Sequence, residues 1–239
     1  MSNLKDTDLI VPASVAPAAP VTVPTVSAKR VYGKKNPQER VAERRDRLLQ
    51  AGLQLFATKG YANTTIEALC SESKVTTRHF YQVFKGREEL LLALYEQLMV
   101  ELQAGLLSAM QAEHSSLQQK MQQVIQALVN QYLSDTRRAQ VGVIEVVGAS
   151  PVVEKRRREV IHAIAMHLQA FLDGLAAQQK IPRRNYYWLA IAIVGGINEL
   201  IADWLMSPTL TLAQLSDEIV FAASTLLQGI DGTATNFNQ

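Results

Sequence analysis

Residues 64–84, TTIEALCSESKVTTRHFYQVF, constrain the fold of this 239-residue chain most strongly, because they indicate two short helices separated by a tight corner. Thr64 lies three residues before Glu67, a spacing in which the two side chains satisfy free backbone groups at a helix start. The apolar residues that follow have the spacing of one buried helix face: Ile66, Leu69 and Cys70. A polar run from residue 71 to residue 74 then ends the first helix.

The second helix of the pair begins after Val75, and Thr76 is its predicted N-cap. If Phe80 and Phe84, four residues apart, face inward, one outward side carries four polar residues: Thr77, Arg78, Tyr81 and Gln82. Arginine, hydroxyl and amide groups are the side chains that suit base edges and phosphates. The stretch therefore predicts a helix that enters a DNA groove.

At these residues the sequence resembles the TetR family of bacterial transcriptional regulators, over residues 48–98. An F-x-x-x-G-Y signal ends the family's first helix, a T-T pair opens the second, a V-S/T-x-x-x-F/L-Y-x-x-F pattern forms the recognition helix, and a basic residue precedes E-x-L. The matching residues are Phe56, Gly60, Tyr61, Thr64, Thr65, Val75, Thr76, Phe80, Tyr81, Phe84, Arg87, Glu88 and Leu90. The resemblance implies an all-α fold, in which a three-helix DNA-binding domain precedes a larger helical ligand-binding and dimerisation domain.

Three positions depart from the family pattern. Lys74 occupies the corner, where glycine is common and a left-handed backbone carries a modest steric cost for other residues. Arg87 stands where lysine is usual, and Val83 where histidine or tyrosine is common. Lys74 and Val83 leave open an alternative function, an all-helical small-molecule-binding protein with weak or lost DNA binding.

Charge and composition agree with a DNA-binding head. Between Lys29 and Tyr95 there are thirteen Lys and Arg residues against seven Asp and Glu, whereas the net charge of the whole chain is only +2. A basic surplus that coincides with the helix-turn-helix is the electrostatic signature of phosphate binding. The single cysteine, Cys70, excludes an intrachain disulfide and fits a reducing compartment, so we expect a cytoplasmic protein.

The chain is predicted to divide into five parts. Residues 1–35 form an Ala-, Pro- and Val-rich tail without signal-peptide character, which ends in a basic arm for DNA or in a solvated linker. The others are the DNA-binding domain at 36–86, a linking helix at 87–110, a helical effector-binding and dimerisation domain at 111–230, and a tail at 231–239. The predicted helices after the linking helix are 116–133, 136–147, 151–179, 184–206 and 211–228.

The C-terminal domain has two polar residues in apolar surroundings. Glu145 either faces inward toward a ligand or reaches the surface and pairs with a residue such as Arg138. Asn198 either lines an effector pocket or bridges a dimer, because the resemblance implies that helices 184–206 and 211–228 form a four-helix interface with a second copy. We expect no membrane partner, because only about 12 residues separate Asn185 from Asn198, short of the ~20 that span a bilayer.

The sequence contains no nucleophile elbow, phosphate-binding loop or dinucleotide fingerprint, and no metal-ligand spacing, so we expect a non-enzyme without cofactor or metal. The predicted function is a homodimeric regulator, a repressor released from a palindromic double-stranded operator by a small apolar effector. Arg78, Thr77 and Tyr81 are the candidates for base readout. The candidate phosphate contacts are Thr65, Thr76, His79, Gln82, Lys85 and Arg87.

Overall fold

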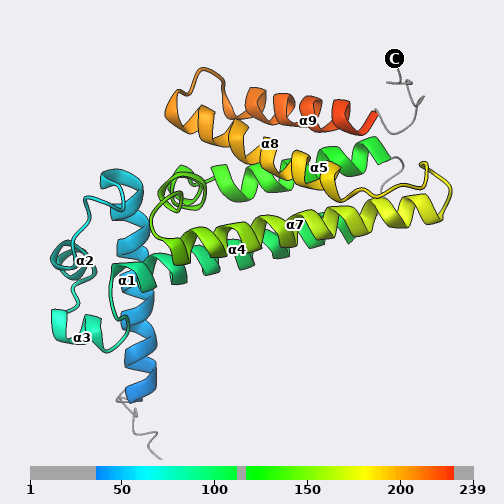
Figure 1. Cartoon of the computed structure of the whole chain (residues 1–239). Helices are drawn as coiled ribbons and strands as arrows, with labels where there is room; N and C mark the ends of the chain where they lie inside the picture. The colour runs from blue at the N-terminus through cyan, green and yellow to red at the C-terminus, as the bar shows by residue number, and fades with distance from the viewer. Residues whose placement is uncertain (1–35, 112–116, 229–239) are drawn as a thin grey trace, which may run out of the picture. The chain divides into compact units, whose positions relative to one another are not determined.

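The structure, a computed structural model, describes residues 36–111 and 117–228. The predicted tails at 1–35 and 231–239, including the basic arm, lie outside these residues. Within the described ranges every regular element is a helix, which confirms the predicted all-α fold (Figure 1). The α-helices are α1 (Pro37–Lys59), α2 (Ile66–Ser73), α3 (Thr77–Tyr81), α4 (Arg87–Gln111), α5 (Leu117–Leu133), α6 (Thr136–Ala139), α7 (Pro151–Ala177), α8 (Tyr187–Met206) and α9 (Leu212–Gln228), and a π-helix, η1 (Gln140–Glu145), follows α6.

Helix α1 has well-defined signals at both ends. The Asn36 side chain accepts from the Gln38 backbone N–H, and the Glu39 carboxylate accepts from the Asn36 N–H, which satisfies two free donors of the first turn. At the other end Gly60 has a φ of 82°, which glycine adopts without steric cost. The turn after α1 is therefore sharp, and it leads directly into α2.

Helix α4 belongs to both parts of the molecule. Its first turns pack on α1, where a Cβ added to Gly52 would come within 2.5 Å of Leu90 Cδ2. Its later turns bury Leu98 and Leu102 against α5 and α7. Helix α4 is therefore shared by the α1–α3 head and the helices behind it.

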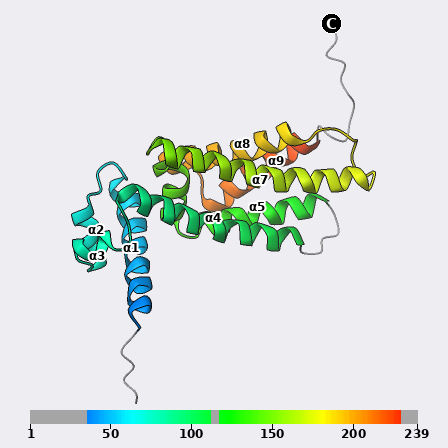
Figure 2. The same ribbon diagram turned by 60° about the horizontal axis from the view of Figure 1, so that its bottom comes forward.

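The C-terminal helices lie side by side, with α4, α5, α7 and α8 running roughly along one another and α9 against α5 and α8 (Figures 1 and 2). The expected single helix at 136–147 is instead one α-helical turn followed by η1. A π-helix is rare and is frequent at functional sites. Both short segments contact α1, so they lie between the head and the bundle.

Three helices, α4, α7 and α8, are long and apolar enough to cross a membrane by length and composition. For α8 this corrects the length used in the sequence argument, which counted only the residues between Asn185 and Asn198, and the absence of a membrane partner stays a prediction. The helix continues past Asn198 to a length of 20 residues. The charged side chains near its end do not bring its mean hydropathy below that of the other two helices. All three helices pack against other helices of the same bundle.

Candidate DNA interface and effector cavity

The start of α2 is capped by Thr65 and not by Thr64. The Thr65 side chain accepts from the Ala68 backbone N–H at 3.2 Å. Thr64 is fully buried, and its hydroxyl donates to the Gly60 carbonyl at 2.8 Å. The T-T pair therefore performs two tasks, because its first hydroxyl closes the turn after α1 and its second starts α2.

The corner between α2 and α3 is formed by Lys74, which has φ 53° and ψ 40°, the left-handed conformation expected there. Its backbone N–H returns to the carbonyls of Cys70 and Ser71. Val75 is buried behind the corner, and the Thr76 hydroxyl caps α3 by accepting from the His79 N–H at 3.4 Å. The corner thus has the geometry of a helix-turn-helix although glycine is absent.

Helix α3 is anchored by its aromatic residues. Phe80 and Phe84 are buried with ring centroids 6.1 Å apart, and the Arg45 guanidinium lies 5.0 Å from the Phe84 ring centroid. The residues on the opposite side stay in solvent, with Tyr81 56% exposed. The other exposed candidates for DNA contact are Thr65, Thr76, Thr77, Arg78, Gln82 and Lys85, whereas His79 is half-buried.

Arg87 is held by the protein itself. Its Nη1 donates to the backbone carbonyls of Tyr61 at 3.1 Å and Ala62 at 3.4 Å, and also to that of Thr64. Its guanidinium lies 5.2 Å from the centroid of the Tyr61 ring. Nη1 of Arg87 therefore secures the loop between α1 and α2, and the phosphate contact expected from the sequence stays a prediction.

Glu145, at the end of η1, holds the same loop from the other side. Its Oε2 accepts the Tyr61 backbone N–H at 2.7 Å, and its Oε1 accepts from Gln140 Nε2 at 2.9 Å. The alternative partner considered from sequence, Arg138, pairs with Glu101 instead. Glu145 thus lies outside the cavity described next, and it links the bundle to the head.

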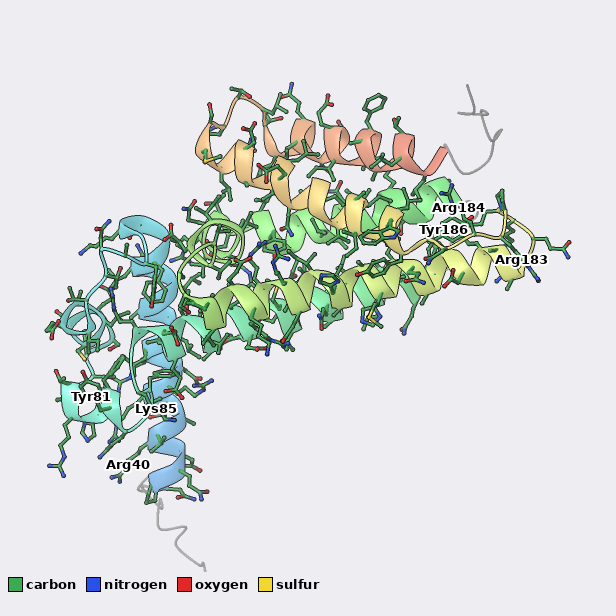
Figure 3. All side chains as sticks on the ribbon, viewed as in Figure 1. Arg40, Tyr81, Lys85, Arg183, Arg184 and Tyr186 are labelled. Carbon is green, nitrogen blue, oxygen red and sulfur yellow. The ribbon has the colours of Figure 1, made fainter. Side chains whose placement is uncertain are left out.

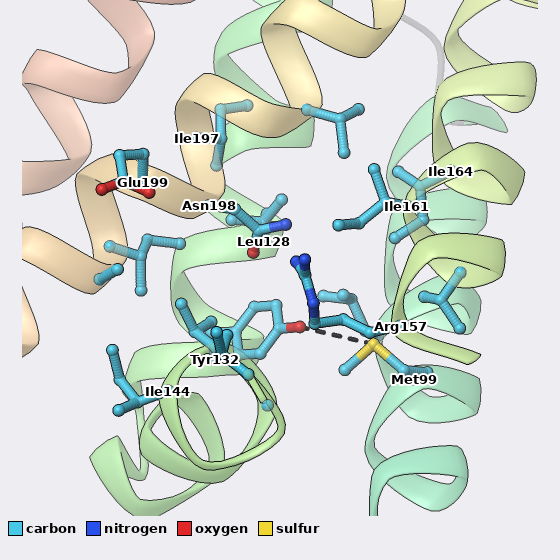
Figure 4. A pocket seen from close by; sticks show the side chains of 18 of the residues that line it. Met99, Leu128, Tyr132, Ile144, Arg157, Ile161, Ile164, Ile197, Asn198 and Glu199 are labelled. Atoms are coloured by element: carbon cyan, nitrogen blue, oxygen red, sulfur yellow. Dashed lines mark hydrogen bonds between the residues drawn. The ribbon is translucent and has the colours of Figure 1, made fainter. Parts of the chain in front are cut away.

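A cavity of about 450 Å³ opens inside the bundle between α4, α5, η1, α7 and α8 (Figure 4). Its walls are largely aliphatic, and Gly142, Val143 and Ile144 of η1 form one of them. Asn198, the second candidate from sequence, lines it. A concave, mostly apolar space of this size with a few polar groups is typical of a small-molecule site.

Besides Asn198 and Glu199 of α8, the polar groups of the cavity come from Tyr95 of α4, Tyr132 of α5 and Arg157 of α7. Burial raises the pKa of both tyrosine hydroxyls, so each keeps its proton and can donate. Arg157 bonds the Glu154 carboxylate through Nε at 2.9 Å and Nη2 at 2.8 Å, and the hydrogen bond to Glu154 raises the arginine's pKa. Figure 4 shows its guanidinium pointing into the cavity.

Comparison with known proteins identifies the head. A model of bacterial regulatory proteins of the tetR family matches residues 48–94. An uncharacterized HTH-type transcriptional regulator of Bacillus subtilis, YerO, is 41% identical over 54 residues, which are 23% of this chain and 19% of that protein. Residues 48–94 therefore form a DNA-binding domain of the TetR family of transcriptional regulators.

The TetR fold extends beyond the head. A Syntrophomonas wolfei protein assigned to the TetR family superposes with a TM-score of 0.70 at 19% identity, over 82% of this chain and 99% of that one. FadR of Bacillus subtilis, solved in complex with stearoyl-CoA, superposes with a TM-score of 0.67 at 19% identity, over 77% and 98%. At such identities the likeness shows the fold alone. The sequence match, by contrast, spans about a fifth of YerO's length.

The TetR family consists of regulators and not enzymes, in agreement with the predicted non-enzyme. In the described part of this TetR-family chain, no group of three or more His, Cys, Asp and Glu side chains could hold a metal. His162 shares a hydrogen bond of 2.9 Å between its Nδ1 and the Tyr187 hydroxyl.

Sequence reasoning missed several residues of both sites. Tyr95, Tyr132 and Arg157 lie on separate helices. Their spacing within apolar patterns indicates that they face inward, but it does not show whether they face a cavity or a packed core. Arg40 lies far from the motif in sequence, yet Figure 3 shows it with Tyr81 and Lys85 at the end of the head away from the bundle. The surplus of basic residues along α1 was the available signal for Arg40.

Proposed function

We propose that this TetR-family chain is a sequence-specific DNA-binding transcriptional regulator of the cytoplasm, a homodimeric repressor that a small apolar effector releases from a palindromic operator. The observation that carries the proposal is the outer side of α3, where polar residues stand in solvent on a helix anchored by Phe80 and Phe84. That arrangement fits a recognition helix in a major groove.

Within the proposed interface the residues divide by chemistry. Arg78, Thr77 and Tyr81 read base edges, with the Arg78 fork on guanine. Lys85, near the start of α4, contacts phosphates, as do the exposed Thr65, Thr76 and Gln82 and the half-buried His79. Arg87 contributes by keeping the loop before α2 in place, because its guanidinium is already engaged by carbonyl groups.

The proposed dimer interface is the outer side of α8 and α9. Phe221 and Trp188 are 68% and 73% exposed there, and Leu226 and Leu200 also reach solvent. A space between the two helices is lined by Gly196, Leu200 and Ala222 among others, so apolar surface remains uncovered. Exposed apolar patches of this kind mark interaction surfaces, and a two-fold pair of recognition helices then meets half-sites ~34 Å apart.

The effector proposal rests on the cavity and on its connection to the head. Residues 142–144 of η1 line the cavity, and Glu145, the next residue, holds the Tyr61 N–H. An effector that changes the position of η1 therefore acts on the loop before the helix-turn-helix. Such an effector shifts the equilibrium only if it binds the two positions with different affinity. The stearoyl-CoA complex of the structural relative supports a ligand with a long acyl chain in this fold.

The experiment that tests the proposal is selection of bound sequences from a random double-stranded DNA pool by the purified full chain, at moderate salt. We expect a palindromic motif with half-sites one helical turn apart, and steep salt dependence of binding. If a folded protein enriches no motif and binds DNA independently of sequence, the proposal fails. An all-helical small-molecule-binding protein that has lost DNA binding would then be the better account.

A further inference from the structure

The cavity gathers hydrogen-bond donors that the protein leaves without partners. Tyr95 is only 2% exposed, and its hydroxyl has no hydrogen-bond partner among the described residues. Every fully buried side-chain nitrogen or oxygen in that part of the chain has one, so the Tyr95 hydroxyl must face the open space of the cavity. Because an unpaired buried polar group costs free energy, this hydroxyl points to a ligand.

Arg157 and Asn198 add to the same polar end. Two of the three guanidinium nitrogens are occupied by Glu154, whereas Nη1 bonds no protein acceptor in the described ranges. The Asn198 amide likewise has no protein partner among the described residues, and Figure 4 shows it facing the Arg157 guanidinium. The Tyr132 hydroxyl donates only to a thioether, Met99 Sδ, at 3.5 Å. Donors of this kind around one point match an acceptor with several lone pairs.

Arg157 places a cation at this end, and its partner Glu154 offsets part of that charge. Among the described residues that line the cavity, Arg157 is the only cationic one and Glu199 the only acidic one. Figure 4 shows Glu199 on the far side of the cavity from the Arg157 guanidinium. The bidentate bond to Glu154 fixes the orientation of the arginine, so Nη1 is presented without further loss of side-chain freedom.

The opposite end of the cavity is mostly aliphatic and leads to further space. A second, narrower cavity of about 80 Å³ shares Leu128, Ile164, Val194 and Ile197 with the first. Leu106, Leu107 and Phe171 line it further along α4 and α7. The combined space is therefore long. Its polar groups gather around Arg157 in the first cavity, whereas most of the residues that line the second are apolar, with Gln103, Lys120 and His167 as the exceptions.

From this arrangement we propose that the cavity binds a long-chain carboxylic acid, whose carboxylate accepts from Arg157 Nη1, the Asn198 amide and the Tyr95 hydroxyl. The hydrocarbon tail passes Leu128 and Ile164 into the second cavity. This inference rests on the effector cavity of the proposed function and names the chemical class of its ligand. Burial of each methylene contributes about 0.8 kcal/mol, so affinity rises with chain length until the second cavity is filled.

The test is isothermal titration calorimetry of the full chain with dodecanoate, and with the matched alcohol dodecanol and the methyl ester. We expect dodecanoate to bind roughly ten- to hundred-fold more tightly than either neutral molecule, because charge-assisted hydrogen bonds exceed neutral ones. Octanoate should bind more weakly than dodecanoate. Equal affinity of acid and alcohol would overturn the carboxylate assignment.

Variants locate the carboxylate. Arg157→Gln should weaken dodecanoate roughly ten- to hundred-fold and leave dodecanol unchanged. The matched control is Arg158→Gln, on the same helix and against the same Glu154, because its side chain is 71% exposed and lines no cavity. Lys120, whose ammonium lies 5.2 Å from the Phe171 ring centroid beside the second cavity, tests the reverse orientation. A loss in Lys120→Gln, with none in Arg157→Gln, would overturn the proposed direction.

Folding and DNA binding are measured separately from ligand binding. Thermal melting of each variant shows whether a lost affinity reflects a lost fold, and Asn198→Leu offers a second change at the polar end that adds no charge. A protein that selects a DNA motif but binds no dodecanoate would refute this inference and leave the proposed function standing. Tight dodecanoate binding without any DNA motif would support this inference and refute the proposed DNA-binding function.

Discussion

Glu145 Oε2 accepts the backbone N–H of Tyr61 at 2.7 Å, and this bond joins the π-helical segment of the bundle to the loop that opens the helix-turn-helix. The three residues before Glu145 line the cavity. The cavity proposed as the ligand site and the residue that holds the head are thus adjacent along η1. The contact between Arg137 Nη1 and Gln54 Oε1, at 2.7 Å, is a second link between the same two parts.

Replacing Glu145 by alanine should uncouple the two sites. Because the loop would lose its acceptor on the bundle side, an effector should lower operator affinity much less than it does in the unchanged protein, with at least ~1 kcal/mol of coupling lost. The measurement is operator affinity with and without effector. Tyr61→Phe serves as the control, since the bond uses the backbone amide, and it should respond normally. Equal coupling in Glu145→Ala and the unchanged protein would contradict the link.

Replacing Arg78 and replacing Lys85 should weaken DNA binding in different ways. Arg78→Ala is expected to cost ~1 to 3 kcal/mol on the selected motif and to relax one base preference. Lys85→Ala should weaken all DNA sequences about equally and reduce the salt slope by about one. Quantitative binding to the motif and to a scrambled duplex, over a salt series, distinguishes the two outcomes. Identical loss of specificity in both variants would refute the division into base readout and phosphate contact.

The main effect of Arg87→Ala should be a lower free energy of unfolding, with loss of a DNA contact as a secondary effect. The substitution leaves the carbonyls of Tyr61, Ala62 and Thr64 without their donor, and hydrogen bonds to a charged group are each worth about 1.5 to 3 kcal/mol. Exposure of the site reduces the sum, so we expect a loss of ~2 kcal/mol in the free energy of unfolding, measured by denaturant titration. Lys85→Ala, as the control, should unfold like the unchanged protein. Unaltered stability of Arg87→Ala would contradict this role.

Phe221→Glu should dissociate the proposed dimer. A carboxylate on the outer side of α9 would be buried without a partner in a helix-helix interface, which costs several kcal/mol. Sedimentation analysis should then show monomers, and affinity for the palindromic motif should fall steeply. Met166→Glu is matched to it, because Met166 is 61% exposed on α7, outside the α8–α9 surface. Monomerisation by both variants, or by neither, would refute the assigned interface.

Stability should fall in acid. The hydrogen bond from Arg138 holds the pKa of Glu101 below its ordinary value of 4.5, and the bond from Arg137 does the same for Asp135 below 3.8. A carboxyl whose pKa is lowered by folding stabilises the native state above its unfolded pKa and loses that contribution as pH falls through the folded value. The melting temperature should therefore drop as pH is lowered past 4.5. Glu101→Gln should show a shallower drop, and parallel profiles would contradict the assignment.

Much of the fold follows from local signals in the sequence. Asn36, Pro37 and Gly60 mark the ends of α1, and the paired Phe80 and Phe84 orient α3. These signals act over a few residues, so a single sequence displays them. Thr64 and Thr65 were harder to separate, because adjacent hydroxyls offer two cap positions and only the buried turn at Gly60 decides between them.

The functional roles of single residues depended on contacts that no local pattern encodes. Glu145 and Tyr61 are 84 positions apart, and Arg87 meets carbonyls more than 20 positions away. Residues 140–145, which form η1, were expected to be α-helical, because a π-helix has no strong signal of its own in sequence. Asn198 was recognised as a candidate because a polar group in an apolar helix needs a partner wherever the helix packs.

The bond from Glu145 to Tyr61 uses a main-chain amide, which every residue type except proline provides. The recognition residues can therefore be replaced to match a new operator without altering the backbone N–H that Glu145 binds. For protein engineering, this means that the head can be exchanged. A different head that preserves the backbone of the 60–64 loop should remain under the control of the original ligand.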